Sequence, residues 1–309
     1  MFRLIGERIL STAILIAAVS VVAFTLIQLP PGDFADSYAN KKAQGGVVIT
    51  LEEVDEMRHK LGLDRPFHIQ YLDWIGDVLQ GDFGFSWEFH RPVSEVIGER
   101  LGLTLALAFS TLFFTYLLAL PIGIYSAIRQ YSIGDHVMTL LGYIGLATPN
   151  FMLALILLYL GSEWFGISAG GLYSPEYAEA PWSMGKFWDM LAHMWVPVLV
   201  LGTAGTAFQM RTMRATLLDE INKMYVVAAR AGGISEFKLL MKYPVRMALN
   251  PIVSTLGWEL TNIISGAPIG ALVLSLPDTG PLFLQALINQ DMYLAGAMIL
   301  IYCVLVVIG

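Results

Sequence analysis

The chain contains 309 residues, of which 56% are hydrophobic and only 14% are charged. Soluble globular domains carry about 25% charged residues, so the composition excludes an ordinary water-soluble fold. The net charge of −7 argues against a nucleic-acid-binding surface, which is normally basic. A single cysteine, Cys303, excludes an intrachain disulfide scaffold and a cysteine-rich metal site. These properties together indicate a membrane protein.

Six stretches that are almost free of charge are each long enough to cross a hydrocarbon core of about 30 Å as a helix. The first is too long for a cleavable secretory segment and is followed by Pro30-Pro31-Gly32, which predicts an uncleaved anchor. The sequence therefore predicts an all-α membrane protein with six transmembrane helices. The stretches are Ile9–Leu29, Leu101–Ile128, Val137–Ser162, Met190–Met210, Met247–Pro277 and Met292–Gly309.

The distribution of lysine and arginine predicts how these helices are oriented. The N-terminal tip carries Arg3 and Arg8, and residues 209–250 carry seven basic residues against three acidic ones. Residues 30–100 instead carry thirteen acidic residues against seven basic ones. We therefore expect a multi-pass protein of the cell (inner) membrane, with a cytoplasmic N-terminus, a cytoplasmic segment 209–250 and an external segment 30–100.

The external segment is long enough to form a small helical cap. Thr50 followed by Glu53 is the pattern of a capping box, and Gly62 is a suitable helix stop. A second cap helix is predicted from about Phe67 to Gln80, with its apolar residues on one face. We expect three regions: 1–29 (N-terminal tip and first transmembrane helix), 30–100 (external cap) and 101–309 (five-helix core with the inner loop 209–250).

The sequence contains few residues that could perform chemistry. It lacks the G-x-x-x-x-G-K-[ST] motif, so we expect this chain to bind no ATP itself, and no His, Cys and carboxylate cluster indicates a metal. Glu259 is the one clear ionisable residue within an apolar stretch, and Trp258 and Asn262 lie within one helical turn of it. These three residues are candidates for the polar wall of a translocation path. Alternatively, Glu259 pairs with an arginine or a backbone group at a helix interface.

The inner loop contains the most informative local pattern. Residues 225–231 predict a short helix with small side chains, Gly232-Gly233 predicts a break, and Ser235 is a good N-cap for a new helix. Alanine side chains allow such a helix to approach another protein closely. The basic flanks suit either a protein-docking surface or anionic lipid headgroups, and the residues alone leave both interpretations open.

The sequence resembles the membrane-spanning permease subunits of ABC importers of the dipeptide/oligopeptide/nickel type. In the inner loop, Val227-Ala228-Ala229 and Gly233 occupy the places of that family's E-A-A-x-x-x-G motif, with Val227 in place of the glutamate. Pro277-Asp278-Thr279-Gly280 stands where many relatives carry Pro-Gly-Leu-Gly. Further similar segments are Leu61-Gly62-Leu63-Asp64-Arg65-Pro66, Gly81-Asp82-Phe83-Gly84, Leu120-Pro121-Ile122-Gly123 and Thr148-Pro149-Asn150-Phe151.

This resemblance implies a type I ABC importer permease fold and a chain that is not itself an enzyme. It implies a second homologous permease subunit, two cytoplasmic ATPase subunits that bind ATP and Mg, and an external solute-binding protein, all working at the lipid bilayer without nucleic acid. The expected cargo is a di- or oligopeptide, with oligosaccharides or another small solute as the alternative. An ion-coupled secondary transporter is the alternative from a different class. The implied ATPase-coupling residues are Val227, Ala228, Ala229, Arg230, Ala231, Gly232, Gly233 and Ser235.

Relatives in that family usually continue into a short basic tail on the cytoplasmic side. This sequence stops at Gly309, within the last apolar stretch. We therefore expect that the sequence is truncated there.

Overall fold

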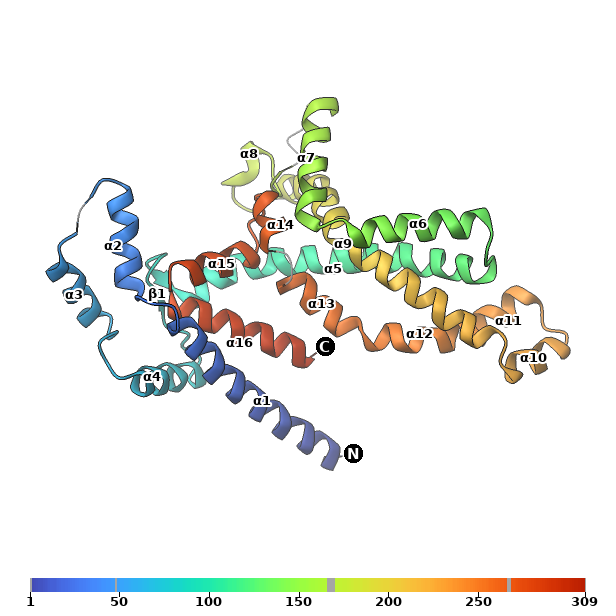
Figure 1. The fold of residues 1–309 in the computed structure, drawn as a ribbon, viewed down its shortest axis with the longest axis horizontal. Coiled ribbons are helices and arrows are strands. Elements are labelled where there is room, and N and C mark those ends of the chain that lie inside the picture. The colour runs from blue at the N-terminus through green and yellow to red at the C-terminus, as the bar shows by residue number, and fades with distance from the viewer. Residues whose placement is uncertain (1, 48, 166–169, 266–267, 309) are drawn as a thin grey trace. The chain divides into compact units, whose positions relative to one another are not determined.

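The structure is a computed structural model that describes residues 2–47, 49–165, 170–265 and 268–308. Most of these residues are helical (Figure 1), which agrees with the predicted helical class. The described part also contains a small antiparallel hairpin of β1 (Phe85–Ser86) and β2 (Arg91–Pro92). The chain divides into two compact units, and α5 (Val93–Ile128) runs from the first into the second. The units are Met1–Leu103 with Asp278–Ile308, and Thr104–Pro277.

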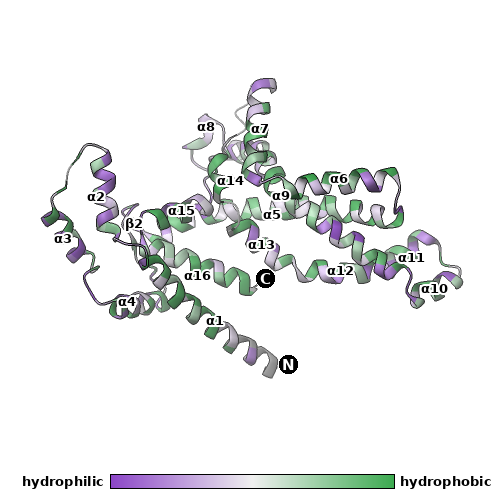
Figure 2. Cartoon of the chain, viewed as in Figure 1, coloured by the Kyte–Doolittle hydropathy of each residue, from purple (hydrophilic) through white to green (hydrophobic). Residues whose placement is uncertain are grey.

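The first unit brings the two ends of the chain together. α1 (Phe2–Gln28) packs along α16 (Met292–Ile308), and Figure 2 shows that both helices are predominantly hydrophobic. At the centre of this unit the rings of Phe24 and Trp74 stack with 5.5 Å between their centroids, and both side chains are fully buried. The remaining helices of the unit are α2 (Phe34–Gln44), α3 (Leu51–Lys60), α4 (Phe67–Leu79) and α15 (Thr279–Ile288).

Three local signals predicted between α1 and α5 are confirmed: the capping box, the glycine stop and the start of the second helix. The Glu53 amide donates to Thr50 Oγ1 at 3.3 Å, and the Thr50 amide donates to Glu53 Oε2 at 2.8 Å, which completes the capping box of α3. Gly62 follows α3 with φ +69°, a left-handed conformation that glycine adopts without steric cost. α4 begins at Phe67, as predicted, and ends one residue before Gln80.

The second unit is organised around the long helix α9 (Met184–Ile221). α6 (Ile133–Ala147), α7 (Asn150–Phe165) and α12 (Pro244–Ser254) pack against it, as Figure 1 shows. Its core includes Met213 and Leu217 of α9, which are fully buried and pack with apolar residues of α12. The shorter helices of the unit are α8 (Pro175–Ala178), α10 (Met224–Ala231), α11 (Glu236–Lys242), α13 (Leu256–Ser265) and α14 (Pro268–Val273).

Among the described residues, three helices are long and apolar enough to cross a membrane: the Leu10–Gln28 part of α1, α5 and α9. The pair α6 and α7 adds a fourth crossing if it forms one broken span, because the two helices are bent by 103° at the break. The stretch Val137–Ser162 is therefore not the single straight helix that its composition suggested. Pro149 explains the break, since it disfavours helical geometry at Thr148, whose ψ of 116° is extended.

The predicted stretch Met247–Pro277 is also interrupted. α12 ends at Ser254, and the chain continues as the separate helices α13 and α14. The last predicted stretch forms α16, a helix of 17 residues. The structure thus contains several apolar spans, whereas the number of six membrane crossings remains a prediction.

Candidate functional site

The first candidate site is the inner loop that joins α9 to α12. The predicted short helix is α10, and the predicted break follows at Gly233, whose φ is +77°. α11 then begins after Ser235, which occupies the N-cap position with an extended backbone but makes no side-chain cap hydrogen bond. In Figure 1, α10 and α11 lie at the end of α9 that is far from α8. The short helix, the glycine break and the position of the new helix start are therefore as predicted, whereas Ser235 does not make the hydrogen bond expected of an N-cap.

One apolar side chain anchors each of the two loop helices. Val226 of α10 and Leu239 of α11 are fully buried. An ion pair bridges the glycine break, because Arg230 Nε donates to Glu236 Oε1 at 2.6 Å. This hydrogen bond holds the pKa of Glu236 below its usual range. The two helices thus form a defined hairpin rather than a flexible connection.

Most of the other side chains of this hairpin are exposed. Val227 is 44% exposed, and Phe237 at the start of α11 is 78% exposed. Ala228 and Ala231 are exposed as well. This exposed surface is compatible with either a docking partner or the headgroup region of the membrane. Of the predicted coupling residues, only Ala229 is half-buried.

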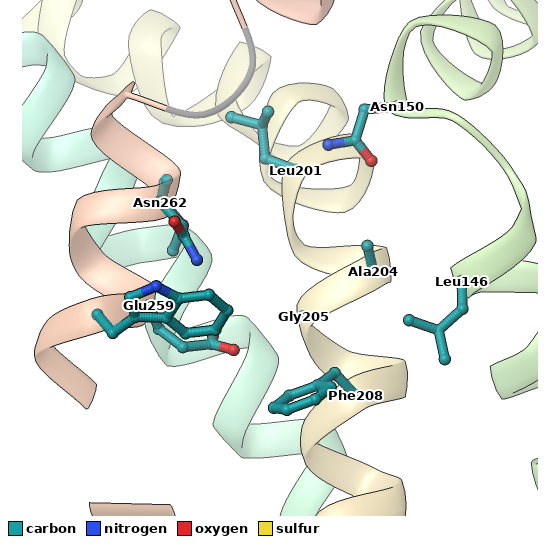
Figure 3. A pocket seen from close by; sticks show the side chains of 10 residues that line it. Leu146, Asn150, Leu201, Ala204, Gly205, Phe208, Glu259 and Asn262 are labelled. Carbon is teal, nitrogen blue, oxygen red and sulfur yellow. The ribbon is translucent and has the colours of Figure 1, made fainter. Parts of the chain in front are cut away.

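The second candidate site is a cavity of about 360 Å³ in the second unit. Figure 3 shows its walls: α13 carries Glu259 and Asn262, α9 lies opposite, and Leu146 and Asn150 stand at the junction of α6 and α7. Trp258 also lines the cavity. The structure therefore brings together the three residues that the sequence predicted for a polar wall. Residues of α9 that line the cavity are Leu201, Ala204, Gly205 and Phe208.

Glu259 is the most buried polar residue in the wall of the cavity, with 6% of its surface exposed. The Gln209 amide nitrogen donates to Glu259 Oε1 at 3.1 Å and to Thr255 Oγ1 at 3.2 Å. A Cβ atom on Gly205 would lie 3.4 Å from Glu259 Oε2, so this glycine allows α9 to approach the carboxylate closely. Among the described residues, the hydrogen-bond partner of this carboxylate is the uncharged side-chain amide of Gln209, and no arginine pairs with it.

Sequence reasoning missed Gln209 and Asn150 as members of this site. Gln209 is fully buried, and its Oε1 has no hydrogen-bond partner among the described residues. The available signal was a glutamine near the end of the apolar stretch Met190–Met210, because polar side chains within such stretches usually find a partner on another helix. Asn150 offered the weaker signal of a polar residue directly after the helix-breaking Pro149.

Comparison with known proteins identifies the family. Residues 1–108 match the N-terminal part of the binding-protein-dependent transport system membrane components, and residues 119–309 match the inner membrane component itself. The chain therefore belongs to the family of binding-protein-dependent transport system inner membrane components. It is a permease subunit of an ABC importer, a non-catalytic, multi-pass protein of the inner membrane that works with an ATPase and a binding protein.

Curated relatives resemble this chain over almost its full length. A putative peptide permease protein of Brucella ovis is 34% identical over 99% of this chain and 94% of its own. The oligopeptide transport system permease protein AppB of Bacillus subtilis is 32% identical over 98% of this chain and 93% of its own. The glutathione transport system permease protein GsiC of Salmonella choleraesuis is 30% identical over 98% of this chain and 92% of its own.

Proposed function

We propose that this permease imports di- or oligopeptides. The proposal rests on full-length similarity to relatives whose names specify peptides, oligopeptides and glutathione, the last of which is itself a peptide. Oligosaccharides or another small solute are the alternative cargo, because Pro277-Asp278-Thr279-Gly280 departs from the motif expected at that position.

In this proposal the chain forms half of the translocation path, and a second homologous permease subunit forms the other half. Trp258, Glu259 and Asn262 contribute to the wall of that path. The observation that carries this assignment is the 360 Å³ cavity, in which the three side chains meet beside α9. Trp258 is 57% exposed in the isolated chain, as a residue that faces a path between two subunits would be.

The same proposal assigns the hairpin of α10 and α11 to coupling. Two cytoplasmic ATPase subunits bind ATP and Mg, and one of them holds the surface that includes Val227, Ala228, Ala231 and the Gly232-Gly233 break. Closure of the ATPases moves α10, and α9 and α12 transmit the movement to the path. Alternating access then follows from the different affinities of the partners for two conformations. This chain binds no nucleotide or metal itself.

The topology that fits this mechanism has six crossings. Region 1–29 supplies a cytoplasmic tip and the first helix, region 30–100 supplies an external cap that receives the binding protein, and region 101–309 supplies five helices. The basic segment 209–250 then faces the cytoplasm, as the distribution of lysine and arginine requires.

Purification of the chain from its native membrane tests the proposal. Mild detergent extraction followed by mass spectrometry is expected to recover a second permease and two ATPase chains. A panel of peptides and oligosaccharides applied to the cognate binding protein then identifies the cargo. Recovery of the chain alone, or only with copies of itself, would contradict the coupling role of α10. It would favour an ion-coupled carrier in which Glu259 is the first candidate for the ion-coupling residue.

A further inference from the structure

The cavity beside Glu259 has a chemical character more specific than that of a polar passage. Among the described residues, no lysine, arginine or histidine forms an ion pair with this buried carboxylate, and its hydrogen-bond donor is the uncharged Gln209. A buried carboxylate is costly unless a cation or several hydrogen-bond donors compensate it. In a membrane-spanning segment, such a residue normally marks a site of function.

The size and the aromatic lining of the cavity restrict what could compensate that charge. A volume of about 360 Å³ lies at the lower end of the range of about 300–1,000 Å³ that is typical of small-molecule sites. Trp258 and Phe208 line the cavity from α13 and α9, and aromatic faces attract organic ammonium groups. Asn150 and Asn262 supply amide groups that can hydrogen-bond to a peptide backbone. An anionic group would find no counter-charge among the described residues of this wall.

We infer that this cavity receives a primary ammonium group of the transported peptide, with Glu259 as the counter-charge and the Trp258 and Phe208 rings beside it. The inference rests on the proposed function, since it names the part of the cargo that this half of the path recognises. Gln209 acts as a positioning residue, because its amide holds one oxygen of Glu259 and leaves Oε2 on the side of Gly205. The ammonium group can come from the N-terminus of the peptide or from a lysine side chain.

A chemical probe of the cavity tests the charge preference without any peptide. The only native cysteine, Cys303, is replaced (Cys303→Ser), and Asn262→Cys is introduced into the complete transporter. Two methanethiosulfonate reagents are compared, one that ends in a primary ammonium and one that ends in a sulfonate, with labelling of this chain quantified by mass spectrometry. After correction for their intrinsic reactivity, the ammonium reagent is expected to react about tenfold faster, because a charged cleft raises the local concentration of its counter-ion.

The matched variants assign that preference to one side chain. Glu259→Gln is expected to bring the two corrected rates within about twofold of each other, whereas Glu176→Gln, an exposed carboxylate outside the cavity, leaves the preference intact. Ala204→Cys repeats the measurement from α9 in case Asn262→Cys does not assemble. Equal rates in the presence of Glu259, or a preference that survives Glu259→Gln, would overturn the inference. Equal rates are also the outcome if a cationic side chain of the second permease already occupies the cavity.

Transport measurements then separate the two sources of the ammonium group. Three peptides are compared in proteoliposomes: one with a free N-terminus and no lysine, its N-acetylated form, and an N-acetylated form that contains lysine. Glu259→Gln is expected to lower uptake of the peptide with the free N-terminus about tenfold. Uptake of the N-acetylated peptide without lysine is expected to stay within about twofold of the wild-type value. If Glu259→Gln also lowers uptake of the acetylated peptide that contains lysine, the cavity accepts either kind of ammonium group. If uptake of that peptide is unchanged, the cavity accepts the N-terminal ammonium alone.

The proposed function and the inference fail in different ways. If wild-type transporter takes up none of the peptides with ATP, the peptide-import proposal is wrong. If it takes them up and Glu259→Gln lowers all three equally, peptide import stands and the ammonium assignment is wrong. Where the binding protein rejects acetylated peptides, the labelling experiment alone decides the inference.

Discussion

Arg214 of α9 holds Asp135 of α6 through two hydrogen bonds of 2.9 Å, one from Nε to Oδ1 and one from Nη2 to Oδ2. Asp135 is only 2% exposed, and it also accepts a hydrogen bond from the Tyr131 amide at the entrance to α6. This bidentate arrangement restricts both distance and orientation. The pair therefore fixes the first turn of α6 against the helix that leads into the hairpin of α10 and α11.

Breaking this pair is expected to destabilise the second unit. Asp135→Ala removes the counter-charge of Arg214 and is expected to lower the free energy of unfolding by about 2 kcal/mol. This figure is below the cost for a fully buried pair, because the Arg214 side chain is 26% exposed. Denaturant unfolding of Asp135→Ala, Arg214→Ala and the double variant measures the interaction. Strictly additive losses would show that the pair contributes nothing as a pair.

Close packing of a glycine against a tryptophan is expected to limit substitution in the first unit. A Cβ atom on Gly296 of α16 would lie 2.8 Å from the Trp74 ring, which is 1% exposed. Gly296→Ala is therefore expected to lower the free energy of unfolding by about 1–3 kcal/mol through overpacking. Gly76→Ala on α4 is the matched control, since a Cβ there meets no atom within 4 Å among the residues that the structure describes. A stability change as small as that of the control would refute the predicted contact.

The buried carboxylate of Asp278 is expected to make stability depend on pH. Asp278 is 8% exposed, and burial raises its pKa from 3.8 to about 6, although the Gly280 amide and Arg100 oppose the increase. Because the folded state binds the proton more tightly than the unfolded state, this residue stabilises the fold most below pH 4. That contribution is lost as the pH rises towards 6 and amounts to about 2–3 kcal/mol.

Asp278→Asn tests the predicted direction of this pH dependence. Asparagine cannot ionise, and it keeps the side-chain oxygen that accepts a hydrogen bond from the Gly280 amide. We expect the variant to gain stability relative to the wild type as the pH rises from 4 to 7. Thermal unfolding of the two purified transporters across that range measures the difference. Parallel curves for the wild type and the variant would contradict the raised pKa.

Gly233 is expected to determine coupling through its backbone rather than through contacts within this chain. Its φ is +77°, and a Cβ atom there would meet no atom of the described residues within 4 Å. Gly233→Asn is expected to retain most of the transport per ATP, because asparagine tolerates this conformation, whereas Gly233→Val lowers it about fivefold or more. Gly233→Trp is expected to leave assembly possible but to uncouple ATP turnover from transport.

Gly46→Val is the matched control for this series. Gly46 has a similar φ of +83° and lies in the first unit, and an added Cβ there would likewise meet no atom within 4 Å in the part of the chain that the structure describes. Transport and ATP hydrolysis are measured together in proteoliposomes. Transport by Gly233→Trp at the wild-type level would remove the coupling role of the loop.

Features that depend on neighbouring residues in the chain could be predicted from the sequence. The capping box of Thr50 and Glu53, the start of α4 at Phe67 and the break at Gly233 are all present, because each is set by a few local backbone hydrogen bonds and dihedral angles. The proximity of Glu259 and Asn262 also followed from helical spacing alone.

Features that depend on residues far apart in the sequence could not be predicted in this way. Gln209 donates to a carboxylate 50 residues away, and Arg214 finds its partner 79 residues away. The residues around Gln209 do not indicate which helix faces it. Whether Pro149 breaks its apolar stretch was left open by the sequence, because hydropathy alone does not register where a helix bends.

Uptake of a labelled peptide into proteoliposomes tests the central claim most directly. The wild-type chain is reconstituted with the permease and ATPase chains that purify with it, and the cognate binding protein is added outside. We predict uptake that requires both ATP and the binding protein and that does not respond to an imposed ion gradient. Uptake driven by a proton or sodium gradient without ATP would contradict the account.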